Sequence, residues 1–252
     1  NKPKKCGGKA MKKVLITGAS KGIGNAIAKE LAQRGYLVMA NYNHSEKEAK
    51  CLQKELQEKG YQIQIKKADV SNPKEAEELV KETIEKLGNI DILINNAGIS
   101  QIKLFTDITV EEWNNMINTN MNSLFYVTKN VLPQMIQQKQ GCIINISSIW
   151  GMTGASCEVH YSTAKAGMIG FTKALAKEVA PSQIRVNCIA PGIIDTQMNQ
   201  ELTEQERREI VNQIPLGRVG NVIDIVKCVN WLIEDNYTTG QIISPNGGWV
   251  IS

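Results

Sequence analysis

Hydrophobic and polar positions follow two alternating patterns from Lys12 onward. Short runs of β-branched apolar residues indicate buried strands, and amphipathic stretches lie between them. Strands are predicted over residues 12–18, 36–42, 62–70, 90–98, 141–148, 184–192 and 240–248. Helices are predicted over residues 23–34, 45–59, 73–87, 110–137 and 158–179. Strands that alternate with helices are typical of βαβ units, so we expect a single α/β domain with a doubly wound sheet of about seven parallel strands.

Two of the predicted helices carry boundary signals. Ser45 and Glu48 have the spacing of a capping box, in which each side chain bonds the backbone N–H of the other residue. Pro73 opens the following helix and Gly88 ends it, as is usual for proline and glycine at helix ends.

The composition is that of an ordinary globular protein. The chain has 252 residues, of which 42% are hydrophobic and 21% charged, and this length suffices for one domain with a large core. No apolar run reaches the roughly 18 to 20 residues that span a bilayer, so we predict no membrane partner. The six cysteines form no CxxC pair and the two histidines complete no zinc spacing, so we expect no metal and reduced thiols in the cytoplasm.

The net charge of +4 comes from the first ten residues. They hold four lysines and no acid, and removing them takes the 29 basic residues to 25, against 25 acidic ones. We expect residues 1–10 to be a basic extension or an expression scar, and residues 11–252 to be the domain. Because the domain is neutral, we predict no nucleic-acid partner; binding through the basic extension is the alternative.

A glycine-rich turn follows the first predicted strand. In "TGASKGIG", residues 17–24, the glycines allow the backbone to approach a pyrophosphate, and the next helix offers free N–H groups to it. A turn without a ligand is the alternative. The residues expected to contact a dinucleotide here are Gly18, Ser20, Lys21, Gly22, Ile23 and Gly24.

The end of the second strand bears on the choice of cofactor. NAD sites usually carry an acid there to hold the ribose 2′-hydroxyl, but "ANYNHS", residues 40–45, has none. Asn41 and Tyr42 stand at this place, and Lys21 could meet a 2′-phosphate with its ammonium group. The sequence therefore favours NADPH; a solvated Lys21 is the alternative.

A possible acid–base group lies farther along the chain. Tyr161 and Lys165 are four residues apart on a predicted helix, so they share a face. We expect the lysine ammonium to lower the pKa of the phenol and make it a general acid. Ser148, at the carboxyl end of a strand, could donate a hydrogen bond to a substrate carbonyl. The alternative is a tyrosine that only packs in the core.

These residues together resemble a known family. "TGASKGIG", "NNAG" at 95–98, Asn120, Ser148 and "YSTAK" at 161–165 are similar to the classical short-chain dehydrogenase/reductase family, in order and spacing, from about Lys12 to the end. The resemblance implies a Rossmann-type, NADP-binding domain and an enzyme that acts on CH–OH groups. A non-catalytic protein that senses NADPH is the alternative from another class.

The resemblance also implies roles for single residues. Ser148 would position the carbonyl, Tyr161 transfer the proton, Lys165 tune Tyr161 and bind the nicotinamide ribose, and Asn120 hold a water, with Asn118 and Asn122 as its rivals. The further residues assigned to the cofactor are Asp69, Val70, Asn96, Ala97, Gly98, Pro191, Gly192, Ile194 and Thr196.

Two branches of the family are similar to this chain. "GFTKALAKEVAPSQIRVNCIAPGIIDTQM" and "IPLGRVG" resemble 3-oxoacyl-[acyl-carrier-protein] reductases, which implies fatty-acid chemistry, acyl carrier protein as partner and a homotetramer or homodimer. Lys139 matches the basic residues that dock the carrier in that branch, but Ser182 stands where an arginine is often found.

The second branch comprises reductases proposed to finish the 5-aminopentanone modification of elongation factor P. "SSIWGMTGASCEV" and "GQIISPNGGW" resemble it. In this alternative Glu158 would attract an ammonium-bearing ketone and Trp150 would flank it. Equally open is a structural role, with Glu158 stabilising a helix dipole and Trp150 in the core. Residues 197–213, with Met198 in the substrate pocket, would form a lid or a plain surface helix.

Overall fold

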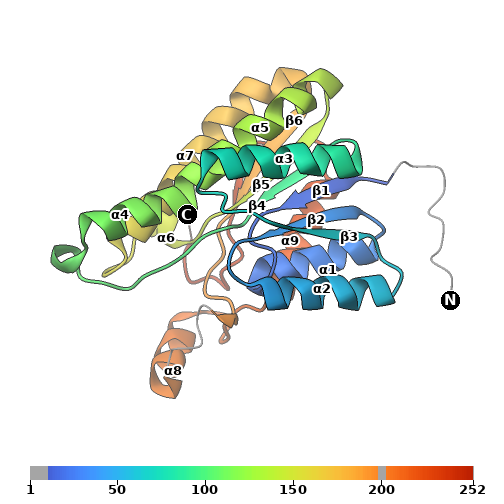
Figure 1. Cartoon of the computed structure of the whole chain (residues 1–252). Helices are drawn as coiled ribbons and strands as arrows, with labels where there is room; N and C mark the ends of the chain where they lie inside the picture. The colour runs from blue at the N-terminus through green and yellow to red at the C-terminus, as the bar shows by residue number, and fades with distance from the viewer. Residues whose placement is uncertain (1–10, 198–202, 252) are drawn as a thin grey trace.

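Seven parallel strands form one sheet in the computed structural model, which describes residues 11–197 and 203–251 (Figure 1). The spatial order is β3-β2-β1-β4-β5-β6-β7, so the chain starts in the middle and winds outward in both directions. The strands are β1 Lys13–Ile16, β2 Leu37–Tyr42, β3 Ile63–Lys67, β4 Ile92–Asn95, β5 Gly141–Ile146, β6 Ile184–Ile189 and β7 Ile242–Ile243. The predicted doubly wound sheet is confirmed.

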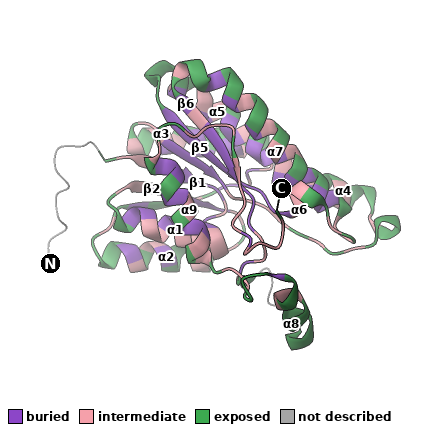
Figure 2. Ribbon diagram, turned by 180° about the vertical axis from the view of Figure 1, so that it is seen from behind, coloured by how far each residue is buried: buried purple, intermediate pink, exposed green. Residues whose placement is uncertain are grey.

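Helices cover both faces of the sheet (Figure 1). One face carries α1 Gly22–Gln33, α2 Glu46–Glu58 and α9 Val222–Glu234, and the other carries α3 Pro73–Leu87, α5 Ser123–Gln138 and α7 Val159–Val179. Each layer buries its own hydrophobic cluster against the strands, and the five strands from β2 to β6 in the spatial order are buried along most of their length (Figure 2). This two-sided burial explains why these five strands are mostly continuous apolar runs instead of alternating ones. The edge strands β3 and β7 are only partly buried.

The predicted helix over 110–137 is built from three pieces. It begins with α4 Val110–Ile117, passes through a π-helical segment at Asn118–Asn122, and continues as α5. The π segment widens the helix by one residue, a feature that often lies at functional sites. Asn120 points inward from this segment and is fully buried.

Other boundary predictions had mixed outcomes. Asn72 caps α3 ahead of Pro73, and Gly88 ends this helix with a φ of 90°. Ser45 is the N-cap residue of α2, but its side chain makes no capping hydrogen bond, so the predicted capping box is wrong. Helix α9 was not predicted, although Asn221 and Asp224 form a capping box at its start.

Short elements gather at the carboxyl ends of the strands (Figure 1). There α4 follows β4, and α6 Trp150–Thr153 follows β5. Helix α8 Glu204–Gln213 follows β6 and stands apart from the main body, within the predicted lid segment. Met198 lies outside the described residues.

Within residues 11–197 and 203–251, no helix is long and apolar enough to cross a bilayer. The described cysteines are all free thiols. No group of three or more potential metal ligands occurs in the same part of the chain.

Candidate active site

The glycine turn between β1 and α1 adopts a backbone that only glycine takes easily. Gly18 has a φ of 61° and Gly22 a φ of 55°. A Cβ atom on Gly18 would lie 2.8 Å from the Cα atom of Ala97. The turn therefore packs directly on the end of β4, and Gly18 itself adds no side chain to the backbone there, which suits the close approach of a pyrophosphate.

The end of β4 fixes this turn by hydrogen bonds. The Asn96 amide donates to the carbonyl oxygens of Thr17, at 3.0 Å, and Gly18, at 2.9 Å. In return the Thr17 hydroxyl accepts the backbone N–H groups of Asn96 and Ala97, both at 3.0 Å. Asn96 and Ala97 thus lie beside the glycine turn, where the family resemblance places them.

The end of β2 is neutral, as its sequence indicates, but its side chains face inward. Asn41 is buried: its amide oxygen accepts the Gly18 N–H at 3.3 Å, and its nitrogen donates to the carbonyl oxygen of Ala68 at 3.0 Å. Tyr42 is buried as well. Asn41 therefore supports the glycine turn from beneath.

Lys21 lies in the turn and is exposed, as expected, but it has a partner. Its ammonium group forms an ion pair with Glu48 of α2 at 3.0 Å. The lysine holds the pKa of the Glu48 carboxyl below its usual range. Lys21 is thus both exposed to solvent and paired with an acidic side chain.

The remaining predicted cofactor residues follow β3 and β6. The Asp69 carboxylate accepts the N–H and hydroxyl of Ser71, at 2.9 and 2.7 Å, while Val70 is buried in the core. The segment after β6, Pro191–Thr196, runs back to the glycine turn, because the Thr196 methyl group would lie 3.6 Å from a Cβ on Gly22. Pro191, Gly192, Ile194 and Thr196 therefore reach the same edge as Ser20, Ile23 and Gly24.

Ser148 and Tyr161 come together although thirteen positions separate them. Ser148 follows β5 and Tyr161 lies in the first turn of α7, and both are buried. Burial raises the pKa of Tyr161 to about 12, against a hydrogen bond with Ser148 that lowers it. Burial therefore keeps the phenol protonated at neutral pH, so that it has a proton to donate, and at the same time makes it a weaker acid than a free phenol.

Lys165 lies one turn after Tyr161 and is buried too. Its ammonium group donates to the carbonyl oxygen of Ile146 at 3.0 Å and lies 5.6 Å from the centroid of the Tyr161 ring. Burial lowers the pKa of Lys165 to about 8. The expected lowering of the Tyr161 pKa by this lysine is not found, because the ammonium group faces the ring and a backbone carbonyl.

Asn120 is distinguished from its neighbours by burial. Its amide nitrogen donates to the carbonyl oxygen of Ile99 at 3.0 Å, and its oxygen accepts the Ile99 N–H at 3.3 Å, whereas Asn118 is exposed. A Cβ on Gly98 would lie 2.5 Å from the Asn120 oxygen and 3.4 Å from the Lys165 nitrogen. The structure thus brings Asn120 and Lys165 together beside Gly98.

Glu158 and Trp150 border this group. Glu158 is the N-cap residue of α7, but its side chain caps no N–H, and burial raises its pKa above the usual range. It forms no ion pair with any residue in the described part of the chain. Trp150 packs edge-on against Trp249, with ring centroids 5.1 Å apart.

Comparison with known proteins places this site in a family. The sequence model described as short chain dehydrogenase matches residues 12–207. The chain belongs to the short-chain dehydrogenase/reductase family. It is 39% identical over 242 residues to 3-oxoacyl-[acyl-carrier-protein] reductase FabG of Staphylococcus aureus (strain Mu50 / ATCC 700699), a match that covers 95% of this chain and 98% of the relative.

A second relative has no stated substrate. The uncharacterized oxidoreductase YmfI of Bacillus subtilis (strain 168) is 42% identical over 241 residues, covering 94% of this chain and 98% of the relative. The resemblance read from the motifs is confirmed. This short-chain dehydrogenase/reductase is an oxidoreductase that acts on CH–OH groups, and its family uses a nicotinamide cofactor. The glycines of the turn and the buried Lys165 fit such a cofactor at the carboxyl edge of the sheet.

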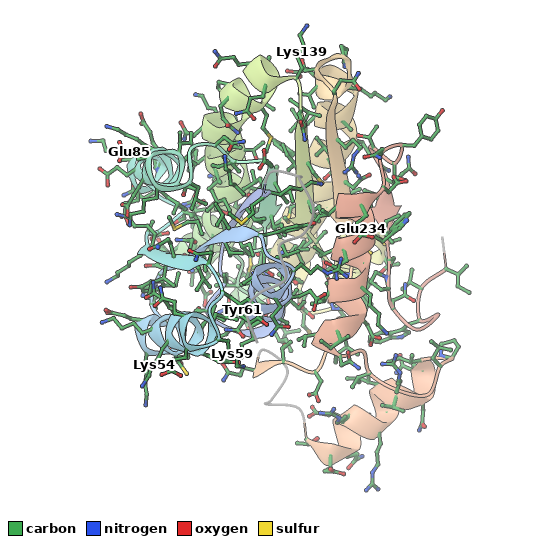
Figure 3. All side chains as sticks on the ribbon, turned by 90° about the vertical axis from the view of Figure 1, so that its right-hand side faces the viewer. Lys54, Lys59, Tyr61, Glu85, Lys139 and Glu234 are labelled. Atoms are coloured by element: carbon green, nitrogen blue, oxygen red, sulfur yellow. The ribbon has the colours of Figure 1, made fainter. Side chains whose placement is uncertain are left out.

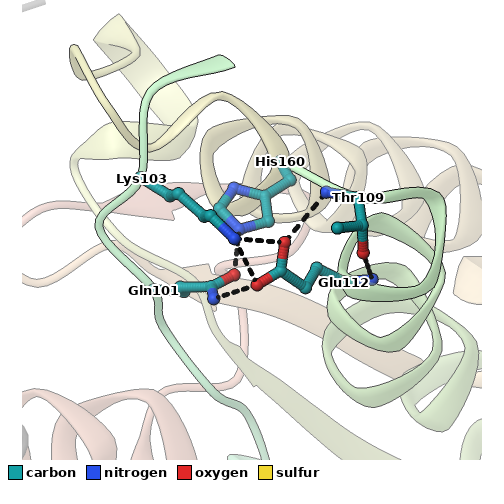
Figure 4. A network of polar contacts seen from close by, with 5 residues as sticks. All are labelled: Gln101, Lys103, Thr109, Glu112 and His160. Carbon is teal, nitrogen blue, oxygen red and sulfur yellow. Dashed lines mark hydrogen bonds and ion pairs between the residues drawn. The ribbon is translucent and has the colours of Figure 1, made fainter. Parts of the chain in front are cut away.

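One polar network of this dehydrogenase was missed in the sequence (Figure 4). His160, beside Tyr161 and fully buried, shares a hydrogen bond of 3.0 Å with the Gln101 amide oxygen, and the Gln101 nitrogen donates to Glu112 at 2.8 Å. Lys103 forms an ion pair with Glu112 at 2.8 Å, and Thr109 caps α4 with the same carboxylate. The network ties the loop after β4 to the start of α7. The Thr-x-x-Glu spacing at 109–112 was the available signal.

One cavity of the described chain lies away from this site. It measures about 530 Å³ and opens at the amino ends of the strands, beside Lys12, Gly141 and Arg185. Lys139, at the C-terminal end of α5, lies at this same edge (Figure 3). Lys139, whose place in the sequence matches a carrier-docking residue, therefore lies at the amino edge of the sheet, whereas Tyr161 of the same chain lies at the carboxyl edge.

Proposed function

We propose that the chain is an NADPH-dependent ketone reductase that reduces 3-oxoacyl thioesters of acyl carrier protein to secondary alcohols. The observation that carries this proposal is the convergence of Ser148 with Tyr161, and of Asn120 with Lys165 at Gly98, at one edge of the sheet. The identity to relatives named 3-oxoacyl-[acyl-carrier-protein] reductase supports the thioester. The same likeness supports a homotetramer or homodimer.

The residues divide the reaction among them. A bound nicotinamide cofactor supplies the hydride that forms the new C–H bond at the carbonyl carbon. Ser148 donates a hydrogen bond to the carbonyl oxygen, where negative charge develops. Tyr161 gives its proton to that oxygen as the C–O double bond becomes single, which suits a phenol that stays protonated at neutral pH.

Lys165 and Asn120 support the proton donor. With a pKa near 8, Lys165 can exchange a proton near neutral pH and can return one to the tyrosinate. Asn120, fixed to both backbone groups of Ile99, is held rigidly enough to position a water in that relay. NADPH is preferred over NADH because the end of β2 carries no acid and Lys21 lies in the glycine turn.

The experiment is turnover with a model thioester. We expect the purified protein to oxidise NADPH in the presence of acetoacetyl coenzyme A and to form one 3-hydroxybutyryl thioester per NADPH consumed. Negligible turnover, with NADPH binding retained, would rule out the thioester as substrate and leave the fold and cofactor assignments in place.

A second substrate class is favoured by Glu158. Its half-buried carboxylate has no ion-pair partner among the described residues, and it lies within one helical turn of Tyr161. An ammonium group on the substrate would compensate such a charge, whereas an anionic phosphopantetheine arm would be repelled. The candidate is the 5-aminopentanone group carried by elongation factor P.

A substitution separates the two substrates. For the cationic ketone, Glu158→Gln is expected to lower kcat/KM for 5-amino-2-pentanone about tenfold and to leave or raise that for acetoacetyl coenzyme A. Glu111→Gln, which removes an exposed charge from the first turn of α4, is the matched control. If Glu158→Gln and Glu111→Gln change kcat/KM equally for both ketones, the cationic ketone is ruled out as the substrate that Glu158 recognises.

A further inference from the structure

A carboxylate reaches the glycine turn from α2, although none stands at the end of β2. Glu48 lies in the first turn of α2 and pairs with Lys21 at 3.0 Å. Its place in the sequence suggests a capping box with Ser45, but that box does not form. The carboxylate is thus turned toward the dinucleotide turn instead of serving its own helix.

Its neighbour in the same helical turn behaves differently. Glu46 pairs with Lys50 at 2.7 Å, within α2 itself. Of the two acids in the first turn of α2, Glu48 is therefore the one that forms an ion pair with a described residue of the glycine turn. Both side chains of the Lys21–Glu48 pair are 41% exposed, so the pair is accessible to a ligand.

This placement sets two charges against each other at one position. Lys21 attracts a 2′-phosphate of nearly two negative charges, while a carboxylate 3.0 Å from its ammonium group repels the same phosphate. A ribose 2′-hydroxyl, in contrast, can donate a hydrogen bond to that carboxylate, as it does to the acid at the end of the second strand in NAD sites.

We propose that Glu48 is a cofactor-selecting residue that opposes Lys21 and narrows the preference for NADPH over NADH. The proposal rests on the NADPH assignment made above. When a 2′-phosphate binds, Lys21 pairs with the phosphate in place of Glu48, and the Glu48 carboxylate loses its ion-pair partner. Removing the carboxylate therefore strengthens binding of the phosphate, and removing Lys21 alone weakens it by more than the loss of one cation, because Glu48 is then left facing the phosphate.

The test measures binding without turnover. Calorimetry gives the Kd of adenosine 2′,5′-bisphosphate and of adenosine 5′-monophosphate for the wild type and for Glu48→Gln, Glu46→Gln and Lys21→Ala. We expect Glu48→Gln to lower the Kd of the bisphosphate about three- to tenfold, with a smaller gain at high salt, and to leave or raise that of the monophosphate. Glu46→Gln removes the same charge from the same helical turn and is expected to change neither Kd.

The double variant gives a second readout. Lys21→Ala is expected to raise the Kd of the bisphosphate, and adding Glu48→Gln to recover part of the loss. If Glu48→Gln and Glu46→Gln bind the bisphosphate equally, the role of Glu48 is overturned while the NADPH assignment stands. If the wild type binds both nucleotides equally and Lys21→Ala changes neither, the NADPH assignment and the role of Glu48 fail together.

Discussion

At the scale of single residues, burial sets the protonation states that the chemistry needs. Tyr161 and Lys165 are both buried, which favours the neutral form of each. Tyr161 therefore stays protonated, with a pKa of about 12, while the pKa of Lys165 falls to about 8. The sequence showed that the two share a helix face, but it could not show that the lysine ammonium would bond the Ile146 carbonyl oxygen.

The buried Lys165 is predicted to cost stability. Its pKa is lower in the folded chain, about 8, than in the unfolded chain, near 10.5. The cost is therefore fully present below pH 8 and is relieved as the pH rises from 8 to 10.5. Lys165→Met is expected to raise the free energy of unfolding at pH 7 by about 1–3 kcal/mol and to abolish turnover.

Urea unfolding of both proteins from pH 6 to 10 measures this difference. We expect a constant advantage of Lys165→Met up to about pH 8 and a shrinking one above it. An advantage that grows above pH 8, or a variant less stable than the wild type at pH 7, would mean that the lysine does not carry an unfavourable charge in the fold.

At the scale of elements, the sequence predicted local structure correctly where a residue had one possible interaction, and incorrectly where several interactions competed for it. The glycine turn was predictable because its backbone excludes other residues. The capping box of Ser45 was wrong because Glu48 pairs with Lys21, which only the tertiary structure brings near. The choice of Asn120 over Asn118 and Asn122 depends on the π-helical segment, whose extra residue has no simple sequence pattern.

The polar network around Glu112 is expected to stabilise the loop after β4, and this stabilisation is expected to weaken at acidic pH. The Lys103 ion pair, the Thr109 N–H and the Gln101 amide lower the pKa of Glu112 to about 2. Its contribution to stability is thus fully present above about pH 4.5 and is lost as the pH falls toward 2. Glu112→Gln is expected to lower the Tm at pH 7, by an amount that diminishes between pH 5 and pH 3.

Circular dichroism melts across this range test the network. Glu111→Gln, in the same turn of α4, is the control and is expected to leave the Tm nearly unchanged. A Tm difference between Glu112→Gln and the wild type that does not depend on pH would show that the carboxylate charge is not what stabilises the loop.

At the scale of the whole molecule, the strand order assembles the site from distant segments. All strands are parallel, and the direction in which the chain adds new strands reverses between β1 and β4. The glycine turn, the end of β4, the end of β5 and the segment after β6 therefore meet at the carboxyl edge. This convergence followed from the predicted parallel sheet. The contact of the C-terminal segment with α6 could not be predicted in this way. Trp150 and Trp249 are ninety-nine positions apart, and no sequence pattern indicates that the two side chains pack together.

The Trp150–Trp249 contact is expected to anchor that segment. In a double-mutant cycle with alanine, the coupling free energy is expected to be about 0.5–1.5 kcal/mol, the range for edge-on aromatic pairs. Trp231, half-exposed on α9, supplies the control pair with Trp150, for which additive effects are expected. Additive effects for Trp150 and Trp249 as well would show that the contact does not stabilise the fold.

The most direct test of the account is a single-turnover measurement on Tyr161→Phe. The phenylalanine keeps the ring and removes only the hydroxyl that donates the proton. With saturating NADPH and acetoacetyl coenzyme A, or the cationic ketone if that is the better substrate, we expect the rate of NADPH oxidation to fall about 10²- to 10⁴-fold while the Kd of NADPH changes less than about twofold. A rate within about tenfold of the wild type would contradict the assignment of Tyr161 as the acid.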